Sequence, residues 1–140
     1  MSVESISPYI FLNGNGNEAI AFYSDALGAK TSHIMYWREM PAEYGGCVPE
    51  DEGRVMHAEI AIGPVALLIA DRPSSRSGPL GGNIDIHLGF SDAASLDAAY
   101  GRLAEGGEAL MAPHDAFWGA RFATLRDRFG VTWVFSSPFA

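Results

Sequence analysis

Residues 6–29, ISPYIFLNGNGNEAIAFYSDALGA, and residues 84–107, IDIHLGFSDAASLDAAYGRLAEGG, follow one plan. Each stretch opens with a short β-rich run, passes through a polar segment typical of a helix start, and continues with apolar residues at helical spacing. In each stretch a Leu near the end of the predicted helix is followed by glycine, a common helix terminator. The chain is therefore expected to contain two copies of one small module.

The remaining segments extend both copies in the same order. For the first copy the patterns predict a helix over 18–27, with Asn15 or Asn17 as its cap, and strands over 6–12, 31–37, 55–62 and 65–70. For the second copy they predict a helix over 93–104 and strands over 84–90, 109–111, 122–126 and 131–135, with a loop over 113–119. The count is β-α-β-β-β twice, an α+β fold class.

The domain organisation that follows is one domain of 140 residues made of two tandem modules. The first module covers about 1–72, the linker RPSSRSGPLGG covers 72–82, and the second module covers about 83–140. Residues 39–53 carry two prolines, paired glycines and an acidic run. This segment is either a mobile loop that covers a pocket or a plain solvated loop.

Composition excludes several classes of function. The formal net charge is −8, and the chain lacks the Lys/Arg cluster typical of nucleic-acid or anionic-membrane binding. No apolar run approaches the roughly 20 residues of a membrane helix, and the first residues do not form a secretory leader. Cys47 is the only cysteine, which fits a reducing cytoplasm. We therefore expect a cytoplasmic protein with neither nucleic-acid nor membrane partners.

Short motifs along almost the whole chain resemble the vicinal oxygen chelate superfamily, which includes glyoxalase I, bleomycin-resistance proteins and extradiol dioxygenases, and in particular its PhnB-like branch. The residues that carry this resemblance are PYIF at 8–11, AIAFY at 19–23, LGA at 27–29, MHAE at 56–59, FWGAR at 117–121, LRDRFG at 125–130 and Trp133. The resemblance implies a cup-shaped mixed β-sheet with the helices outside. It also implies a small-molecule ligand bound in a cleft between modules, and a homodimer.

In the metal-dependent members of that superfamily, His and Glu side chains on four strands hold one divalent cation. The resemblance places these positions near Tyr9, Leu68, Asp85 and Val134, where only Asp85 is able to ligate. It therefore implies that the usual metal site is absent and that no cofactor is needed.

A displaced divalent-metal site is the alternative. Residues two apart on a strand share a face, so His57 lies beside Glu59 and Asp85 lies beside His87. The residues at 84, 86, 88 and 90 are apolar, so we expect their face of the strand to pack against the helices. Asp85 and His87 then lie on the other face, towards the cup. These four residues either hold a metal together or simply line a polar cleft.

Two histidines are the candidate catalytic bases, because neutral imidazole accepts a proton near pH 7. They are His57 and His87, and the alternative is that both lie at the edge of the core. The candidate ligand-binding residues are Tyr9, Asp85, Trp118 and Arg121. Trp118 is placed to stack on a planar ligand and Arg121 to bind an anion; the structural alternative pairs Arg121 with Asp115 or Asp127.

Two functions follow. The first is a binding protein without the usual metal, which holds a small, partly apolar ligand. The second is a metal-dependent lyase, isomerase or dioxygenase that acts on a vicinal-oxygen substrate.

Overall fold

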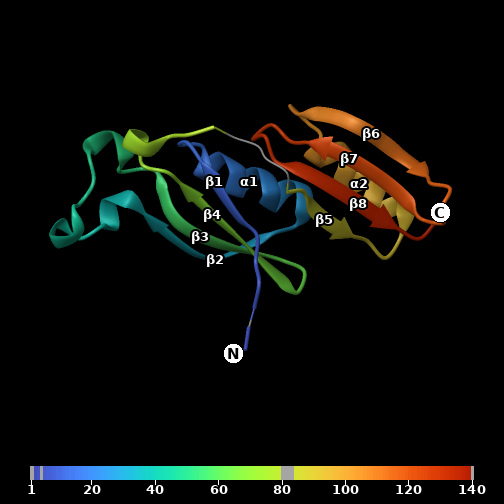
Figure 1. Cartoon of the computed structure of the whole chain (residues 1–140), viewed down its shortest axis with the longest axis horizontal. Helices are drawn as coiled ribbons and strands as arrows, with labels where there is room; N and C mark the ends of the chain where they lie inside the picture. The colour runs from blue at the N-terminus through green and yellow to red at the C-terminus, as the bar shows by residue number, and fades with distance from the viewer. Residues whose placement is uncertain (1, 4, 80–83, 140) are drawn as a thin grey trace. The chain divides into compact units, whose positions relative to one another are not determined.

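The computed structural model of the chain describes residues 2–3, 5–79 and 84–139, in two units, Met1–Pro79 and Leu80–Ala140 (Figure 1). The first unit contains β1 (Tyr9–Leu12), α1 (Gly16–Leu27), β2 (Lys30–Tyr36), β3 (Val55–Ile62) and β4 (Val65–Asp71). The second contains β5 (Ile86–Gly89), α2 (Ala93–Leu103), β6 (Glu108–Asp115), β7 (Arg121–Arg126) and β8 (Thr132–Ser137). The β-α-β-β-β order predicted from the sequence is confirmed in both units.

The two sheets have the same topology. The strand order is β1-β4-β3-β2 in the first sheet and β5-β8-β7-β6 in the second. In each sheet one pair is parallel, β1 with β4 and β5 with β8, and the other pairs are antiparallel. The internal repeat therefore extends to strand order and direction, and the expected α+β class with tandem mixed sheets is confirmed.

Each helix covers one face of its own sheet, and alternate strand residues are buried under it (Figure 1). In the first unit, Ile10 and Leu12 of β1 lie with Ile60 and Ile69 against the helix. In the second, Trp133 and Phe135 of β8 are fully buried, and the ring of Tyr100 on α2 contacts Phe135. The opposite face of each sheet, here called the open face, carries the residues between these buried ones.

The carboxylate of Asp71, at the end of β4, holds the first unit together. Its Oδ1 accepts hydrogen bonds from the backbone N–H groups of Gly14 and Gly16 at 2.9 Å each, and its Oδ2 accepts one from Val55 at 2.9 Å. The indole Nε1 of Trp37 donates to the Asp71 backbone oxygen at 2.9 Å. One buried residue thereby joins the start of α1, the start of β3 and the end of β2.

This arrangement corrects the predicted helix cap. Asn15 occupies the cap position, but it makes no side-chain cap hydrogen bond, and Asn17 donates to the backbone oxygen of Gly53 instead. Asp71, which is distant in sequence, instead binds the N–H of Gly14, just before the helix, and the N–H of Gly16, its first residue. A Cβ atom at position 16 would lie 2.8 Å from Asp71 Oδ2, so only glycine fits there.

Two other predictions differ from the structure for identifiable reasons. Pro113 and His114 were expected in a loop, yet β6 runs to Asp115. Proline is tolerated because β6 is an edge strand and its register with β7 shifts between Met111 and His114. The strand predicted from Ile84 begins at Ile86, which leaves Asp85 before β5.

The segment predicted as a loop over 39–53 forms short 3-10 turns, η1 (Trp37–Glu39), η2 (Ala42–Tyr44) and η3 (Pro49–Asp51). The buried Asp51 anchors its end through an ion pair with Arg54 at 3.3 Å and through the N–H of Ser74. That the segment 39–53 covers a bound ligand stays a prediction.

The predicted linker begins within the first unit. It contains the turn η4 (Ser74–Arg76), and the amide of Asn13 bonds both backbone groups of Gly78. Its last three predicted residues, 80–82, lie outside the described residues. Within the described ranges, neither helix has the length and apolar character needed to cross a membrane.

Replacement of Asp71 by Asn is expected to lower the free energy of unfolding by about 2–4 kcal/mol, because an amide NH2 would face a backbone N–H that now has a charged acceptor. Urea unfolding monitored by circular dichroism measures the change. Glu43→Gln, on the exposed turn η2, is the matched control and should stay within about 0.5 kcal/mol of the parent. Equal stabilities of the two variants would contradict the central role of Asp71.

Candidate functional site

The open face of the first sheet carries a row of planar side chains. On β1, the rings of Tyr9 and Phe11 stack with centroids 4.5 Å apart and an interplanar angle of 16°, and each side chain is 42% exposed. The His57 ring on β3 meets Tyr9 edge-on with centroids 5.6 Å apart. His33 on β2 continues the row, 5.9 Å from His57. Three strands thus supply one aromatic surface that no helix of this unit covers.

The polar centre of this row is a hydrogen bond of 2.7 Å between the Tyr9 hydroxyl and Nδ1 of His57. Burial raises the pKa of Tyr9 above its ordinary value of 10.0, so the phenol is neutral near pH 7. The hydrogen bond forms with either imidazole tautomer: the phenol donates to an unprotonated Nδ1, or its oxygen accepts from an Nδ1–H group. In both cases Nε2 of His57 is left to meet a ligand.

Glu59 does not pair with His57 as its spacing suggested. It lies opposite His33 in the β2–β3 register, and its backbone oxygen accepts a hydrogen bond from the Ser32 hydroxyl at 3.1 Å. His57 and Glu59 do share the open face, as predicted from their two-residue spacing, but the observed partner of the imidazole is Tyr9.

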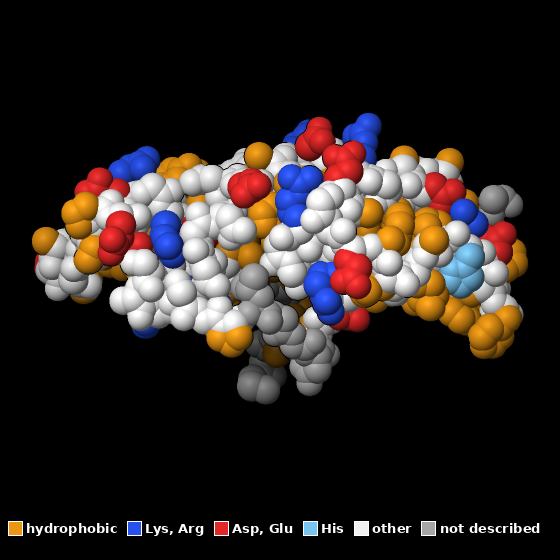
Figure 2. All heavy atoms as spheres, turned by 90° about the horizontal axis from the view of Figure 1, so that it is seen from above, with side chains coloured by type: hydrophobic (Ala, Val, Ile, Leu, Met, Phe, Trp, Pro, Cys, Tyr) orange, Lys and Arg blue, Asp and Glu red, His pale blue; other side chains and the backbone are white. Residues whose placement is uncertain are grey.

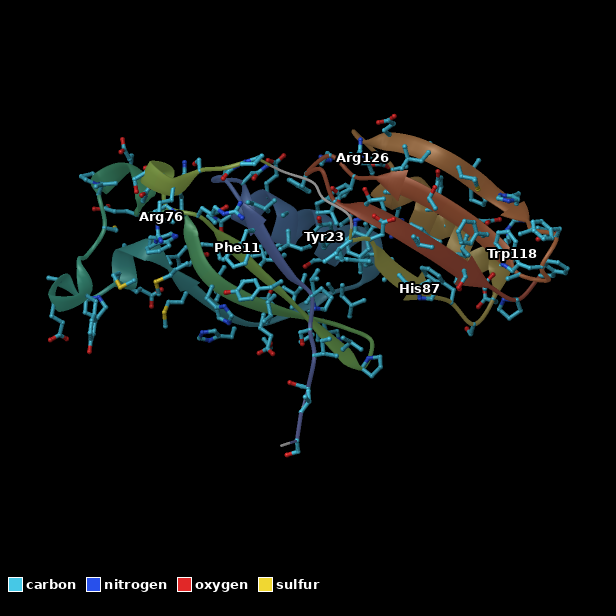
Figure 3. The ribbon with its side chains drawn as sticks, viewed as in Figure 1. Phe11, Tyr23, Arg76, His87, Trp118 and Arg126 are labelled. Carbon is cyan, nitrogen blue, oxygen red and sulfur yellow. The ribbon has the colours of Figure 1, made fainter. Side chains whose placement is uncertain are left out.

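In the second unit, His87 on β5 is exposed, and its Nε2 lies 2.7 Å from the hydroxyl of Ser136 on β8 (Figure 3). The β5–β8 register places His87 opposite Val134, as β1–β4 places Tyr9 opposite Leu68. Asp85 was assigned to this position from the sequence; because it precedes the strand, His87 takes the place instead. Within the described residues 84–139, His87 bonds to Ser136 and not to Asp85.

The loop after β6 carries Trp118, which is 54% exposed and lies edge-on to Phe122 on β7 with centroids 5.1 Å apart (Figure 3). Arg121 is engaged otherwise. Its guanidinium binds both carboxylate oxygens of Asp97 on α2, at 2.8 and 3.0 Å, and Asp115 at 3.1 Å. These contacts raise the pKa of Arg121 and correspond to the structural alternative, with Asp97 as a partner that the sequence did not indicate.

The residues at the family's metal positions do not fit a divalent ion. Leu68 and Val134 have no donor atoms, Tyr9 is held as a neutral phenol by burial, and only His87 offers a ligand. Of the displaced set, His57 and Glu59 belong to the first unit, and Asp85 and His87 to the second. Within the described part of each unit, no three His, Cys, Asp or Glu side chains converge on a point where they would hold an ion.

Sequence reasoning missed Phe11, His33 and Arg72 as residues of the open face. The signal for Phe11 was available, because it stands two residues from Tyr9 on one strand. His33 was hidden because the register between β2 and β3 contains shifts that no pattern predicts. Arg72 was read as the first linker residue, yet its guanidinium carbon lies 5.3 Å from the Phe11 ring centre.

Charges on the remaining surface are mixed. On the face of the molecule that Figure 2 presents, basic and acidic side chains alternate without a continuous basic area.

Comparison with known proteins points to one superfamily. The sequence model described as Glyoxalase/Bleomycin resistance protein/Dioxygenase superfamily matches residues 5–135. Protein YjdN of Escherichia coli K12 is 27% identical over 135 residues, which are 92% of each chain.

Solved structures share the fold. The protein PA1353 of Pseudomonas aeruginosa has a TM-score of 0.88 and 28% identity, and the match covers 99% of this chain and 100% of that one. A Bacillus cereus protein, described as a PhnB protein and putative 3-demethylubiquinone-9 3-methyltransferase, has a TM-score of 0.77 and 20% identity, over 98% and 100% of the two chains. The superfamily resemblance seen in the sequence is thus confirmed.

The Tyr9 phenol is expected to ionise above pH 10, because burial on the open face disfavours the charged phenolate. The tyrosinate absorbance of the parent minus that of Tyr9→Phe, followed through an alkaline titration, isolates this group. The same subtraction in a Tyr44→Phe background, which removes an exposed ring in η2, should give the same midpoint. A midpoint at or below 10 would contradict the effect of burial on the Tyr9 phenol.

Proposed function

The chain belongs to the Glyoxalase/Bleomycin resistance protein/Dioxygenase superfamily, and from this membership we propose that it is a small-molecule-binding protein whose ligand lies on the open face of the first sheet. The observation that supports the proposal most directly is the Tyr9–Phe11 stack, half-exposed on a face that the unit's own helix leaves uncovered. Stacked rings present a flat apolar surface, which suits a planar ligand.

The polar end of this surface favours binding with a defined orientation. The Tyr9–His57 bond orients the imidazole, so that Nε2 presents a hydrogen-bonding atom at the edge of the aromatic row. A ligand hydroxyl placed there gains a directed hydrogen bond with either tautomer, while the ligand's ring lies over Phe11 and Tyr9. The first unit supplies all the residues of this mode; Trp118 and Arg121, also predicted from the sequence as ligand-binding residues, belong to the second unit.

We further propose that binding requires no resident divalent metal. The support is the chemistry of the side chains: Leu68 and Val134 supply no donor, and the Tyr9 phenol is engaged by His57. Metal-dependent lyase, isomerase or dioxygenase chemistry is the competing function, and it requires His57, Glu59, Asp85 and His87 to act as a displaced set. The cytoplasmic location and the homodimer remain predictions from the sequence and the family.

Phe11→Ala is expected to weaken binding of the neutral fluorophore phenylnaphthylamine by about tenfold, because loss of one stacking partner is worth about 1.4 kcal/mol. Fluorescence titration measures the affinity. Val65→Ala is the matched control: Val65 is exposed on β4, but on alternate positions to Leu68, and its loss should leave the affinity unchanged. Failure of the parent to bind the fluorophore, or equal effects of both variants, would count against the proposed face.

Elemental analysis of the untagged protein, before and after dialysis against Zn, Ni, Mn and Fe(II), is expected to find far less than one ion per chain. One tightly held ion per chain that is lost in both His57→Ala and Asp85→Ala would establish the displaced site, and the enzymatic function would then take precedence over metal-free binding. Glu43→Ala serves as the control for loss of a carboxylate elsewhere on the surface.

A further inference from the structure

Arg72 stands where the aromatic row ends. It follows Asp71 directly, and because successive side chains of an extended chain alternate, the buried carboxylate on the helix side turns Arg72 to the open face. There its guanidinium carbon lies 5.3 Å from the ring centre of Phe11. Its backbone is fixed on both sides, since its N–H donates to Leu12 at 2.7 Å and its carbonyl accepts from Arg54 at 2.9 Å.

Three arginines bind carboxylates: Arg54 pairs with Asp51, Arg121 with Asp97 and Asp115, and Arg126 with Glu108. Arg38, Arg72 and Arg76 form no ion pair with any described residue, and of these three only Arg72 is half-buried. The side-chain contact of Arg72 within the described part of the chain is with the Phe11 ring. A half-buried cation with five N–H donors thus lies beside an aromatic surface without a carboxylate to bind.

We propose that the ligand of this site is an aromatic oxyanion, a planar molecule that carries a carboxylate, sulfonate or phosphonate group. Its ring would lie over Phe11 and Tyr9, its anionic group would bind the Arg72 guanidinium in the two-pronged geometry these groups favour, and its far edge would face His57. This inference rests on the proposed function, because it assigns a ligand class to the same face.

Electrostatics make Arg72 the deciding residue for such a ligand. The formal net charge of −8 repels anions at long range. An anion therefore gains favourable binding energy only where a cation lies close to it. Direct contact with a guanidinium is screened much less than the long-range repulsion. A neutral molecule of the same shape gains nothing from Arg72 and relies on the ring stack alone.

The competing explanation is that Arg72 only supports Phe11 through the cation–π contact. The two explanations predict different effects of an Arg72 substitution on the affinity for a neutral ligand. If Arg72 holds the ring in place, its loss weakens every planar ligand equally. If Arg72 binds the ligand's anionic group, its loss weakens only anions.

A pair of fluorophores makes this distinction. Anilinonaphthalene sulfonate and phenylnaphthylamine share one ring system and differ by the sulfonate. In Arg72→Gln, the affinity for the sulfonate is expected to fall about tenfold, while the affinity for the neutral probe stays within about twofold. Arg76→Gln is the matched control, because it removes one exposed positive charge from the same unit (Figure 3) and should change neither affinity.

Each remaining outcome has a definite meaning. Equal losses for both probes in Arg72→Gln, or no loss for either, would overturn the anion assignment and leave the aromatic surface intact. Sulfonate binding that falls in Trp118→Ala but not in Phe11→Ala would place the probe on the second unit and overturn both proposals, as would a parent that binds neither probe. Near-ultraviolet circular dichroism of each variant confirms that the fold is retained.

Discussion

The carboxylate of Asp71 is the constraint on which the first unit depends. A buried charge is costly unless it is hydrogen-bonded, and here three backbone N–H groups from two separate segments satisfy it. The same contacts hold the first residue of α1 and the first residue of β3 in place. Because Asp71 faces the helix, its neighbour Arg72 faces the other way. One buried carboxylate therefore determines both the packing under the sheet and the charge at the edge of the candidate site.

In the second unit, a carboxylate is likewise satisfied by hydrogen bonds, but its partners are close to it in sequence. Asp127 accepts hydrogen bonds from the backbone N–H groups of Phe129 and Val131, at 2.8 and 3.0 Å, and from the indole of Trp133 at 2.8 Å. These contacts close the β7–β8 turn and orient the largest buried side chain of that unit. The helix α2 is capped by its own Asp92, whose pKa is lowered by the hydrogen bond it accepts from the Ser95 N–H. The two copies thus share a topology but not the contacts that stabilise it.

This difference explains what could be predicted from the sequence. Local patterns were sufficient for both helices and most strands, since a helix such as 18–27 carries its apolar stripe and its terminal glycine in adjacent residues. The face shared by His57 and Glu59 was also predictable, because it depends only on strand alternation. The partner of His57 was not predictable. It depends on the parallel β1–β4 pairing and on the placement of β3 beside β4, both of which arise from contacts between residues far apart in the chain.

The resemblance placed Asp85 among the metal positions, and the structure places Asp85 before β5 and His87 within it. The registers place Tyr9 beside Leu68 and His87 beside Val134, so in each parallel pair a polar ring stands opposite an aliphatic residue. Both polar rings are already hydrogen-bonded within their own unit, to His57 and to Ser136. In the metal-dependent relatives a divalent cation receives the substrate oxygens. In this chain the cation beside the aromatic row is the guanidinium of Arg72. An arginine binds an oxyanion through charge and directed N–H groups, but it does not supply the Lewis acidity of an open metal site. The proposed role of Arg72 therefore belongs to recognition of an anion and supplies no Lewis-acid chemistry for its conversion.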